Sequence, residues 1–209
     1  MRLTRILLPL LLLAAITAVR AEDNPARGGE LYVTCAACHG AQGEGNRSLN
    51  APRLTHLAPV YIVAQLQKFK QGTRGGSDAS ESARQMAGIA ATLADDQAMY
   101  DTAAYIANLG GEVSAVTVEA DTQIGAGYYR QYCSACHGPA AEGNLALHSP
   151  RLAGADDWYL LSQLQAFRGG VRGSQAGDKT GKQMRAMAGV LPDDEAVASV
   201  VAYIRSLAQ

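Results

Sequence analysis

The stretch CAACHG at residues 35–40 decides the fold, and it returns as CSACHG at residues 133–138. Each copy has two cysteines three positions apart and a histidine directly after the second cysteine. On a helix, positions i, i+3 and i+4 share one face, so two thiols and an imidazole can meet the same flat ligand. Each copy therefore predicts a helix that presents three ligand-binding side chains together.

Covalent haem attachment requires this arrangement, because each thiol adds to a haem vinyl group while the adjacent histidine reaches the iron. A thioredoxin-like dithiol would be expected in a βαβ context, and the sequence lacks that pattern. A zinc site would need further ligands at matching spacing, but all four cysteines are already used. We therefore expect two covalently bound haem c groups, held by Cys35, Cys38 and His39 and by Cys133, Cys136 and His137.

The chain contains its own pattern twice. At an offset of 98 residues, Cys35 aligns with Cys133 and Tyr105 with Tyr203 without a gap, and we count 32 identities in the 88 pairs between residues 24–111 and 122–209. Self-similarity of this kind indicates repeated structural units. We expect two domains, at residues 22–111 and 122–209, joined by an extended linker at residues 112–121.

Each unit is predicted to be helical. Asn24 followed by Pro25 predicts a capped helix that runs into Cys35. Further helices are expected at residues 59–72 and 95–109, and again from about residue 157 to Gly169 and at residues 193–207, with acids in the first turns of the last helices. No convincing sheet pattern is present. We expect the polar segments around Met86 and Met184 to be loops.

The N-terminus predicts an export signal. Arg2 and Arg5 precede an apolar run at residues 6–16, and small residues end at Ala21, after which we expect cleavage. An uncleaved membrane anchor is the alternative, but the run is about half of the roughly 20 residues that a membrane-spanning helix requires. Loss of the leader removes three arginines and changes the formal net charge from -1 to -4, which argues against a nucleic-acid partner.

The segments CAACHGAQGEGN, APRL, QMAGIAATLADD and AAYIANL in the first unit match CSACHGPAAEGN, SPRL, QMRAMAGVLPDD and VAYIRSL in the second. With these segments the sequence resembles the class I cytochromes c, and as a two-unit chain it is most similar to the dihaem cytochrome c4 group. The resemblance implies an all-α fold of two tandem class I cytochrome c domains related by pseudo-symmetry. It also implies that the carbonyl groups of Pro52 and Pro150 accept hydrogen bonds from the axial histidines.

A thioether at the sixth position of a haem iron raises the reduction potential and closes the site to small ligands. Met86 is the candidate in the first unit, and the repeat aligns it with Met184. Met187 aligns with Ile89, which cannot ligate, although helical spacing puts Met184 and Met187 on one face. We therefore expect His39 with Met86 and His137 with Met184 as the iron ligands, and Met187 as a packing residue.

Basic residues gather around the second methionine segment and at the matching positions of the first unit. We hypothesise that they surround an exposed haem edge and steer an acidic redox partner, although a solvated face is the alternative. His56 and His148 align with Gly154 and Asn50, and both are expected to be exposed loop residues. The basic residues are Arg168, Arg172, Lys179, Lys182 and Arg185, with Lys68, Lys70, Arg74 and Arg84 in the first unit.

These features predict a periplasmic electron carrier that passes single electrons between respiratory-chain partners and has no catalytic residues. Its partners would be redox proteins, such as a membrane cytochrome complex or a terminal oxidase, with peripheral membrane association as one arrangement. A first alternative is the cytochrome subunit of a sulfur-compound-oxidising dehydrogenase, such as a flavin-containing sulfide dehydrogenase. A second alternative is an enzyme, a dihaem thiosulfate oxidase or peroxidase, but no cysteine is spare and both units have a candidate methionine ligand.

Overall fold

The computed structural model describes residues 22–207, so the expected leader at residues 1–21 lies outside the described part of the chain. Every regular element in this part is helical, and extended pairing is limited to two isolated bridges, Asn46 with Ala51 and Asn144 with Ser149. None of its helices is long and apolar enough to cross a membrane. The all-α prediction is confirmed.

Two units follow one another along the chain. The N-terminal unit comprises α1 (Pro25–His39), η1 (Arg47–Leu49), α2 (Pro59–Lys70), α3 (Glu81–Thr92) and α4 (Asp96–Ile106). The C-terminal unit comprises α5 (Thr122–Tyr128), η2 (Tyr129–Cys133), α6 (Ser134–His137), η3 (Leu145–Leu147), α7 (Asp157–Arg168), α8 (Lys179–Ala188) and α9 (Asp194–Ser206). The predicted start of α1 is confirmed, because the Asn24 side chain accepts a hydrogen bond from Arg27 N and Pro25 is the first helical residue.

Each attachment helix packs closely against the last helix of its unit. A Cβ atom added to Gly28 would lie 2.0 Å from Asp101 O, and one added to Gly125 would lie 1.9 Å from the oxygen of Ser199. Only glycine allows the two backbones to approach so closely. One turn further along, the ring of Tyr32 packs against that of Tyr105 with centroids 5.3 Å apart. Tyr129 and Tyr203 repeat this contact at 5.5 Å.

These contacts reveal a one-residue difference between the two attachment helices. Gly28 and Tyr32 correspond in space to Gly125 and Tyr129, which is an offset of 97, whereas Cys35 and Cys133 are offset by 98. The extra residue is absorbed in η2, a π-helical turn in which Ser134 N donates to the carbonyl oxygen of Tyr129, five residues earlier. The prediction of a gap-free repeat is therefore wrong ahead of the cysteines.

The two methionine segments are helical, so the loop prediction is wrong. Met86 lies in α3 and Met184 in α8, and each is the sixth residue of its helix. A capping side chain precedes each helix: Ser80 Oγ accepts from Ala83 N, and Asp178 Oδ1 accepts from Gly181 N at 2.9 Å. These caps satisfy amide groups at the helix start and make helices out of segments that are mostly polar.

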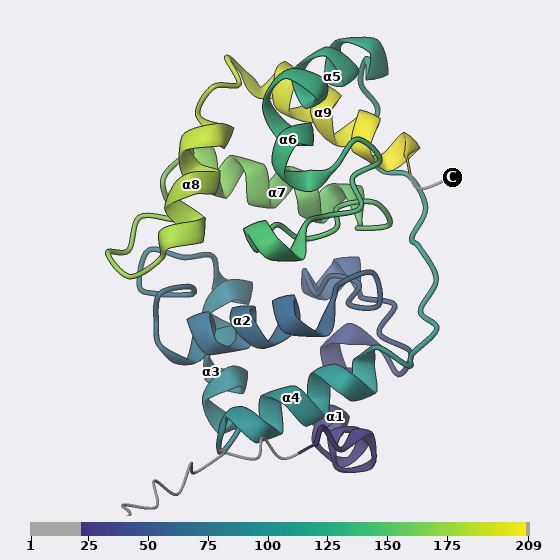
Figure 1. Cartoon of the computed structure of the whole chain (residues 1–209), viewed down its shortest axis with the longest axis vertical. Helices are drawn as coiled ribbons and strands as arrows, with labels where there is room; N and C mark the ends of the chain where they lie inside the picture. Colours follow the sequence, from purple (N-terminus) through teal and green to yellow (C-terminus); the bar gives the residue numbers. More distant parts are fainter. Residues whose placement is uncertain (1–21, 208–209) are drawn as a thin grey trace, which may run out of the picture.

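The units stack with α2 and α7 at their junction, and the linker runs along one side of the molecule (Figure 1). The linker has no helix or strand, as predicted. It is held to the C-terminal unit by two buried carboxylates, since Asp156 accepts from Ser114 Oγ and Asp157 accepts from Thr117 N and Oγ1. Asp156 also accepts from Arg53 N at 2.8 Å, which ties the N-terminal unit to the same point.

Single-residue deletions test whether the π-turn of η2 holds the extra residue of the second attachment helix. Removing Gln131, which is exposed in η2, should convert the π-turn into a regular helix and change the free energy of unfolding by less than about 1 kcal/mol. Removing Val33, which is 72% exposed in the regular helix α1, should turn Tyr32 about 100° away from its pocket and cost about 3 kcal/mol or more. Thermal unfolding of both deletions checks this, and equal losses of stability would contradict it.

Candidate functional site

One cavity of about 850 Å³ is lined by residues of both units. Its apolar walls include Leu54, Ile62 and Phe69 from the N-terminal unit and Leu152, Leu160 and Phe167 from the C-terminal unit. All ten residues that the sequence predicts as site residues border it, as does Met187: Cys35, Cys38, His39, Pro52, Met86, Cys133, Cys136, His137, Pro150 and Met184. Apolar walls with a few polar groups are typical of sites for small molecules and cofactors.

Each histidine is positioned by the turn that follows its helix. The chain leaves α1 at Gly40 in a left-handed conformation (φ 82°), and Gly45 N then donates to the carbonyl oxygen of His39 at 2.8 Å. The Tyr32 hydroxyl donates to the carbonyl oxygen of Gly40 at 2.8 Å. Gly138, Gly143 and Tyr129 repeat these contacts around His137. The turn brings a proline carbonyl group back to each imidazole.

The imidazoles of His39 and His137 bond to the proline carbonyl groups that the resemblance implied. Nδ1 of His39 lies 2.7 Å from the oxygen of Pro52, and Nδ1 of His137 lies 2.9 Å from that of Pro150. A carbonyl oxygen only accepts, so Nδ1 carries the proton. Burial lowers the pKa of both histidines, against an opposing effect of these bonds, so the rings are neutral at pH 7. Nε2 is then unprotonated, which is the form that binds a metal.

The thiol groups do not resemble a reactive dithiol. All four cysteines are free, and burial raises the pKa of Cys35 and of Cys133 to about 11. Redox-active C-x-x-C pairs instead have a cysteine with a lowered pKa. Within residues 22–207, no group of three or more His, Cys, Asp or Glu side chains is placed to hold a metal ion. Two thiols beside one neutral imidazole, on an apolar cavity, fit covalent haem c better than either alternative.

The methionines differ in exposure. Met86 and Met184 are half-buried, and Met86 packs against the core of the N-terminal unit. Met187 is 38% exposed. Because α3 and α8 begin at equivalent residues of the repeat, Met86 and Met184 occupy the same place in their helices. All three line the cavity, so lining alone does not select the ligand.

Comparison with known proteins places this geometry in a family. The family described as Cytochrome c matches residues 25–110 and again residues 123–208. The chain belongs to the cytochrome c family. It is 31% identical to cytochrome c4 of Azotobacter vinelandii over 98% of this chain and 100% of the relative. It is 35% identical to the "Thiosulfate dehydrogenase electron acceptor" of Stutzerimonas stutzeri over 85% of this chain and 80% of that protein.

The solved structures agree with this assignment. Reduced recombinant cytochrome c4 from Pseudomonas stutzeri superposes with a TM-score of 0.67 at 27% identity, covering 88% of this chain and 98% of that chain. The predicted fold of two tandem cytochrome c domains, similar to cytochrome c4, is confirmed. Two cytochrome c domains imply haem c binding, one group for each domain.

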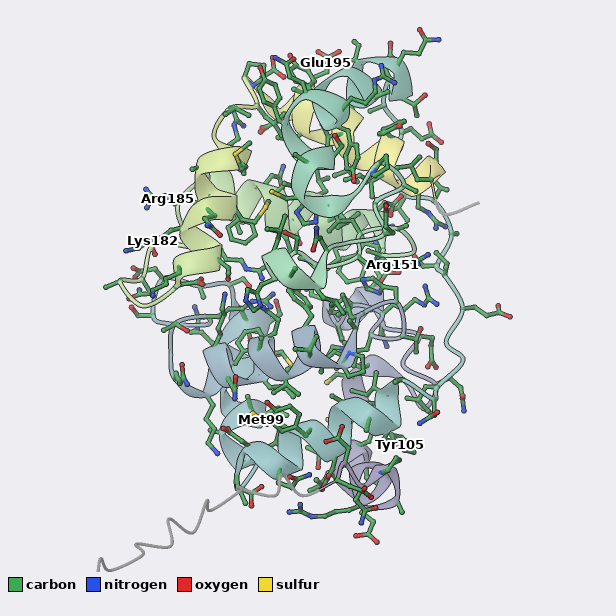
Figure 2. The ribbon with its side chains drawn as sticks, viewed as in Figure 1. Met99, Tyr105, Arg151, Lys182, Arg185 and Glu195 are labelled. Atoms are coloured by element: carbon green, nitrogen blue, oxygen red, sulfur yellow. The ribbon has the colours of Figure 1, made fainter. Side chains whose placement is uncertain are left out.

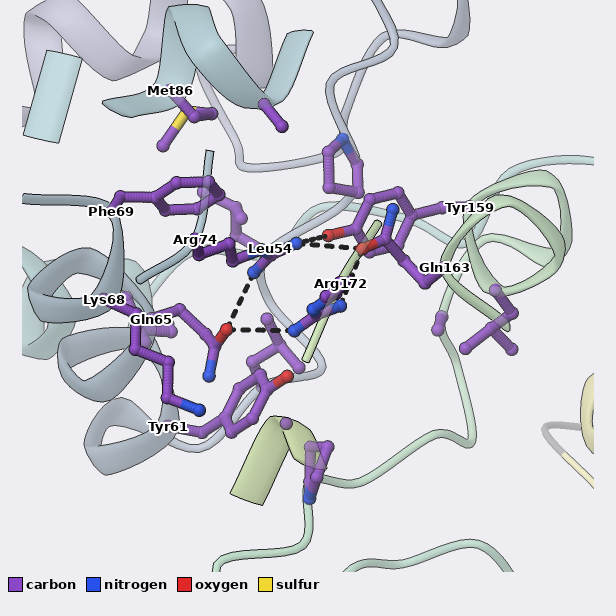
Figure 3. Close-up of a pocket in the computed structure, with 18 of the residues that line it drawn as sticks. Leu54, Tyr61, Gln65, Lys68, Phe69, Arg74, Met86, Tyr159, Gln163 and Arg172 are labelled. Atoms are coloured by element: carbon purple, nitrogen blue, oxygen red, sulfur yellow. Dashed lines mark hydrogen bonds between the residues drawn. The ribbon is translucent and has the colours of Figure 1, made fainter. Parts of the chain in front are cut away.

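A reciprocal hydrogen-bond network at the junction was not anticipated from the sequence. Arg74 donates to Gln65 Oε1 at 2.8 Å within its own unit and to Gln163 Oε1 at 3.0 Å across the junction. Arg172 donates to Gln163 Oε1 at 2.6 Å within its unit and to Gln65 Oε1 at 3.0 Å across it. Figure 3 shows the four side chains meeting beside Tyr159, whose hydroxyl accepts from Arg74 at 2.7 Å.

The two arginines are members of the basic group that was expected to steer a partner, and for them that hypothesis is wrong. Each guanidinium carbon lies 4.4 Å from the centroid of a buried ring, Arg74 over Phe69 and Arg172 over Phe167. Burial and the neighbouring Arg74 lower the pKa of Arg172. Neither arginine forms an ion pair with a carboxylate inside residues 22–207. The identical Gln-x8-Arg spacing in both repeats is the sequence feature that could have indicated this network.

Other members of the basic group are also engaged. Lys68 reaches across the junction to Asp178 at 2.5 Å, and Arg168 pairs with Asp194 at 2.7 Å. Lys70 donates to the carbonyl oxygen of Leu93. The members of the basic group that remain exposed on the C-terminal unit are Lys179, Lys182 and Arg185, all on α8.

The two unmatched histidines behave differently. His148 is exposed, as predicted. His56 is half-buried and lines the cavity, so the prediction of an exposed residue is wrong for it. Its Nδ1 atom is fully buried and has no hydrogen-bond partner in the part of the chain that the structure describes. The loop that carries His56 is covered by the other unit, which a single-unit view of the sequence does not reveal.

The reciprocal network predicts energetic coupling between the units. A double-mutant cycle of Gln65→Leu with Arg172→Met should give a coupling free energy of about 1–2 kcal/mol in chemical unfolding, because the bond is partly buried at the junction. The exposed pair of Arg168→Met with Asp194→Ala should give less than about 0.5 kcal/mol, because Asp194 is 77% exposed. Equal coupling in both cycles would argue against a stabilising role for the network.

Proposed function

We propose that the chain is a periplasmic dihaem electron carrier in which each unit holds one haem c through two thioether bonds. When bound, haem c supplies an iron that cycles between the ferrous and ferric states. The observation that carries the proposal is the repeated arrangement of a neutral histidine, two thiols and a methionine on one cavity. The similarity to cytochrome c4 of Azotobacter vinelandii over the full length supports it.

In this proposal the protein's residues hold the two haem groups and adjust their reduction potentials. Cys35 and Cys38, with Cys133 and Cys136 in the second unit, anchor the cofactors covalently. The proline carbonyl groups hold Nδ1–H of each axial histidine, which fixes the ring and increases the basicity of Nε2. The apolar walls would keep water away from a bound haem, which would favour the less charged ferrous state and so a higher potential. None of these residues acts on a substrate.

We assign the sixth ligands to Met86 and Met184. The equal place of these residues in α3 and α8 supports this choice, whereas Met187 has Ile89 as its counterpart and is more exposed. If His39 with Met86 and His137 with Met184 hold the two irons, both sites would be closed to small ligands, which suits a carrier better than an oxidase or peroxidase. Carbon monoxide binding to the reduced protein would instead favour an enzyme.

The shared cavity supports electron transfer between the two units. Since residues of both units line one continuous cavity, the two cofactors are expected to lie on either side of the junction. An electron could then enter through one unit and leave through the other. The expected leader, cleaved after Ala21, would deliver the chain to the periplasm, where haem c is attached.

A second candidate function concerns the electron donor. The "Thiosulfate dehydrogenase electron acceptor" of Stutzerimonas stutzeri is 35% identical to this chain, which favours a carrier that serves a sulfur-compound-oxidising dehydrogenase. Reduction of the purified protein by such a dehydrogenase with its substrate would support this role. Reduction only by a membrane quinol-oxidising complex would support the respiratory-chain role.

Replacement of each methionine tests the ligand assignment. Wild-type ferric protein should show the near-infrared band of methionine-to-iron coordination at both haems, and Met86→Ala or Met184→Ala should each remove half of its intensity and lower one midpoint potential. Met187→Ala is the matched control and should leave the band unchanged, since its neighbour supplies the ligand. Retention of the full band in Met184→Ala would transfer the role to Met187.

The exposed cations of α8 predict the charge of a docking partner. Lys182 and Arg185 project from α8 (Figure 2), and this helix contains no acidic residue. Replacing both by glutamine should slow oxidation of the reduced protein by hexacyanoferrate(III) by about 2- to 10-fold at low ionic strength and weaken its salt dependence. The control, Arg47→Gln with Arg130→Gln, removes two exposed cations elsewhere. An equal effect in the control would mean that the cations of α8 act only through the net charge of the protein.

A further inference from the structure

His56 lies at the junction of the two units, next to its own counterpart in the other unit. Its counterpart in the repeat is Gly154, and a Cβ atom added to Gly154 would lie 3.5 Å from Cβ of His56. Equivalent residues of two similar units contact each other only close to the axis that relates the units. Gly154 has a left-handed φ of 82°, which other residues rarely adopt, so the N-terminal unit alone supplies a side chain at this place.

A second pair of equivalent residues places positive charge beside His56. Arg53 and Arg151 are equivalent in the repeat, and both act on His56. Burial first, and then these two cations, lower the pKa of His56 to about 3, so the imidazole is neutral at pH 7. The side-chain bonds of the arginines go to backbone carbonyl groups: Arg53 donates to Gly111 and Gly154, and Arg151 donates to Ala153.

The charged and polar atoms here are incompletely satisfied by the protein. Nδ1 of His56 has no partner among residues 22–207, and leaving a buried polar group unpaired costs about 1–3 kcal/mol. The nearby carboxylate of Asp156 is already used by Arg53 N and Ser114 Oγ. His56 and Arg151 line the same cavity as the haem-binding residues of both units. Because Nδ1 is fully buried, the nitrogen of His56 that can reach a group in the cavity is Nε2, and a cofactor that carries carboxylates would supply an acceptor for it.

We propose that His56 donates a hydrogen bond from Nε2 to a carboxylate of bound haem at the junction of the two units. The proposal rests on the proposed function, since it requires haem in the cavity. It makes His56 a positioning and tuning residue that only one unit provides. Because the donor withdraws negative charge from the carboxylate, it favours the reduced iron of that haem and raises its potential above that of the other haem.

Two substitutions separate the hydrogen bond from the packing of the ring. His56→Leu retains much of the volume and removes the donor, whereas His56→Gln keeps a donor. We expect His56→Leu to lower the midpoint potential of one haem, to leave that of the other nearly unchanged, and to shift the carboxylate band in redox-difference infrared spectra. His56→Gln should retain most of both signals, and His148→Gln, which changes an exposed histidine, should have no effect.

Three outcomes would overturn the proposal: potentials and carboxylate band unchanged in His56→Leu, an equal change in both haems, or an equal change in His56→Gln. If His56→Leu does not fold, His56→Gly is used in its place, because glycine is the equivalent residue of the other unit. The expected results are the same. Haem content and the near-infrared band are measured first in the wild type. Fewer than two haems, or no methionine band, would defeat the proposed function, whereas intact haems with unshifted potentials defeat only the role of His56.

Discussion

The hydrogen bond from a buried imidazole to a proline carbonyl group is the constraint on which each unit depends. It links the end of the attachment helix, at His39 or His137, to a residue 13 positions further along the chain. The glycine turn after the histidine and the tyrosine that holds Gly40 or Gly138 exist in both units to complete this link. The bond determines which ring nitrogen is protonated, and therefore which one is free to bind iron.

The same requirement explains why an extra residue is tolerated on one side of the cysteines and not on the other. Between the cysteines and the proline, both units keep identical spacing, because the imidazole and the carbonyl group must meet. Ahead of the cysteines, only Tyr129 and Gly125 need to keep their contacts with α9. A π-turn lets the helix take up one residue while both ends remain in place. Sequence divergence is thus confined to the segment where geometry allows it.

Much of the fold could be predicted from the sequence, and the failures have specific causes. The attachment motifs, the helix starts at Asn24 and Pro59 and the linker depend on local chemistry, which spacing and composition express directly. The π-turn was missed because a one-residue shift over a short segment barely changes the number of identities. The roles of Arg74, Arg172 and His56 were missed because they depend on the other unit. Charge counting identifies cations but does not show what faces them.

Two cationic side chains at the junction between the units, those of Arg74 and Arg172, lie close to each other. Arg74 and Arg172 are stacked on phenylalanine rings and bonded to neutral glutamine and tyrosine side chains, and in residues 22–207 neither has a carboxylate partner. Two half-buried like charges repel each other, so an interface of this kind would be unfavourable by itself. It becomes favourable if the cavity between them receives anionic groups. In the proposed function haem carboxylates would meet that requirement, and docking of the two units and binding of their cofactors would then be mutually dependent.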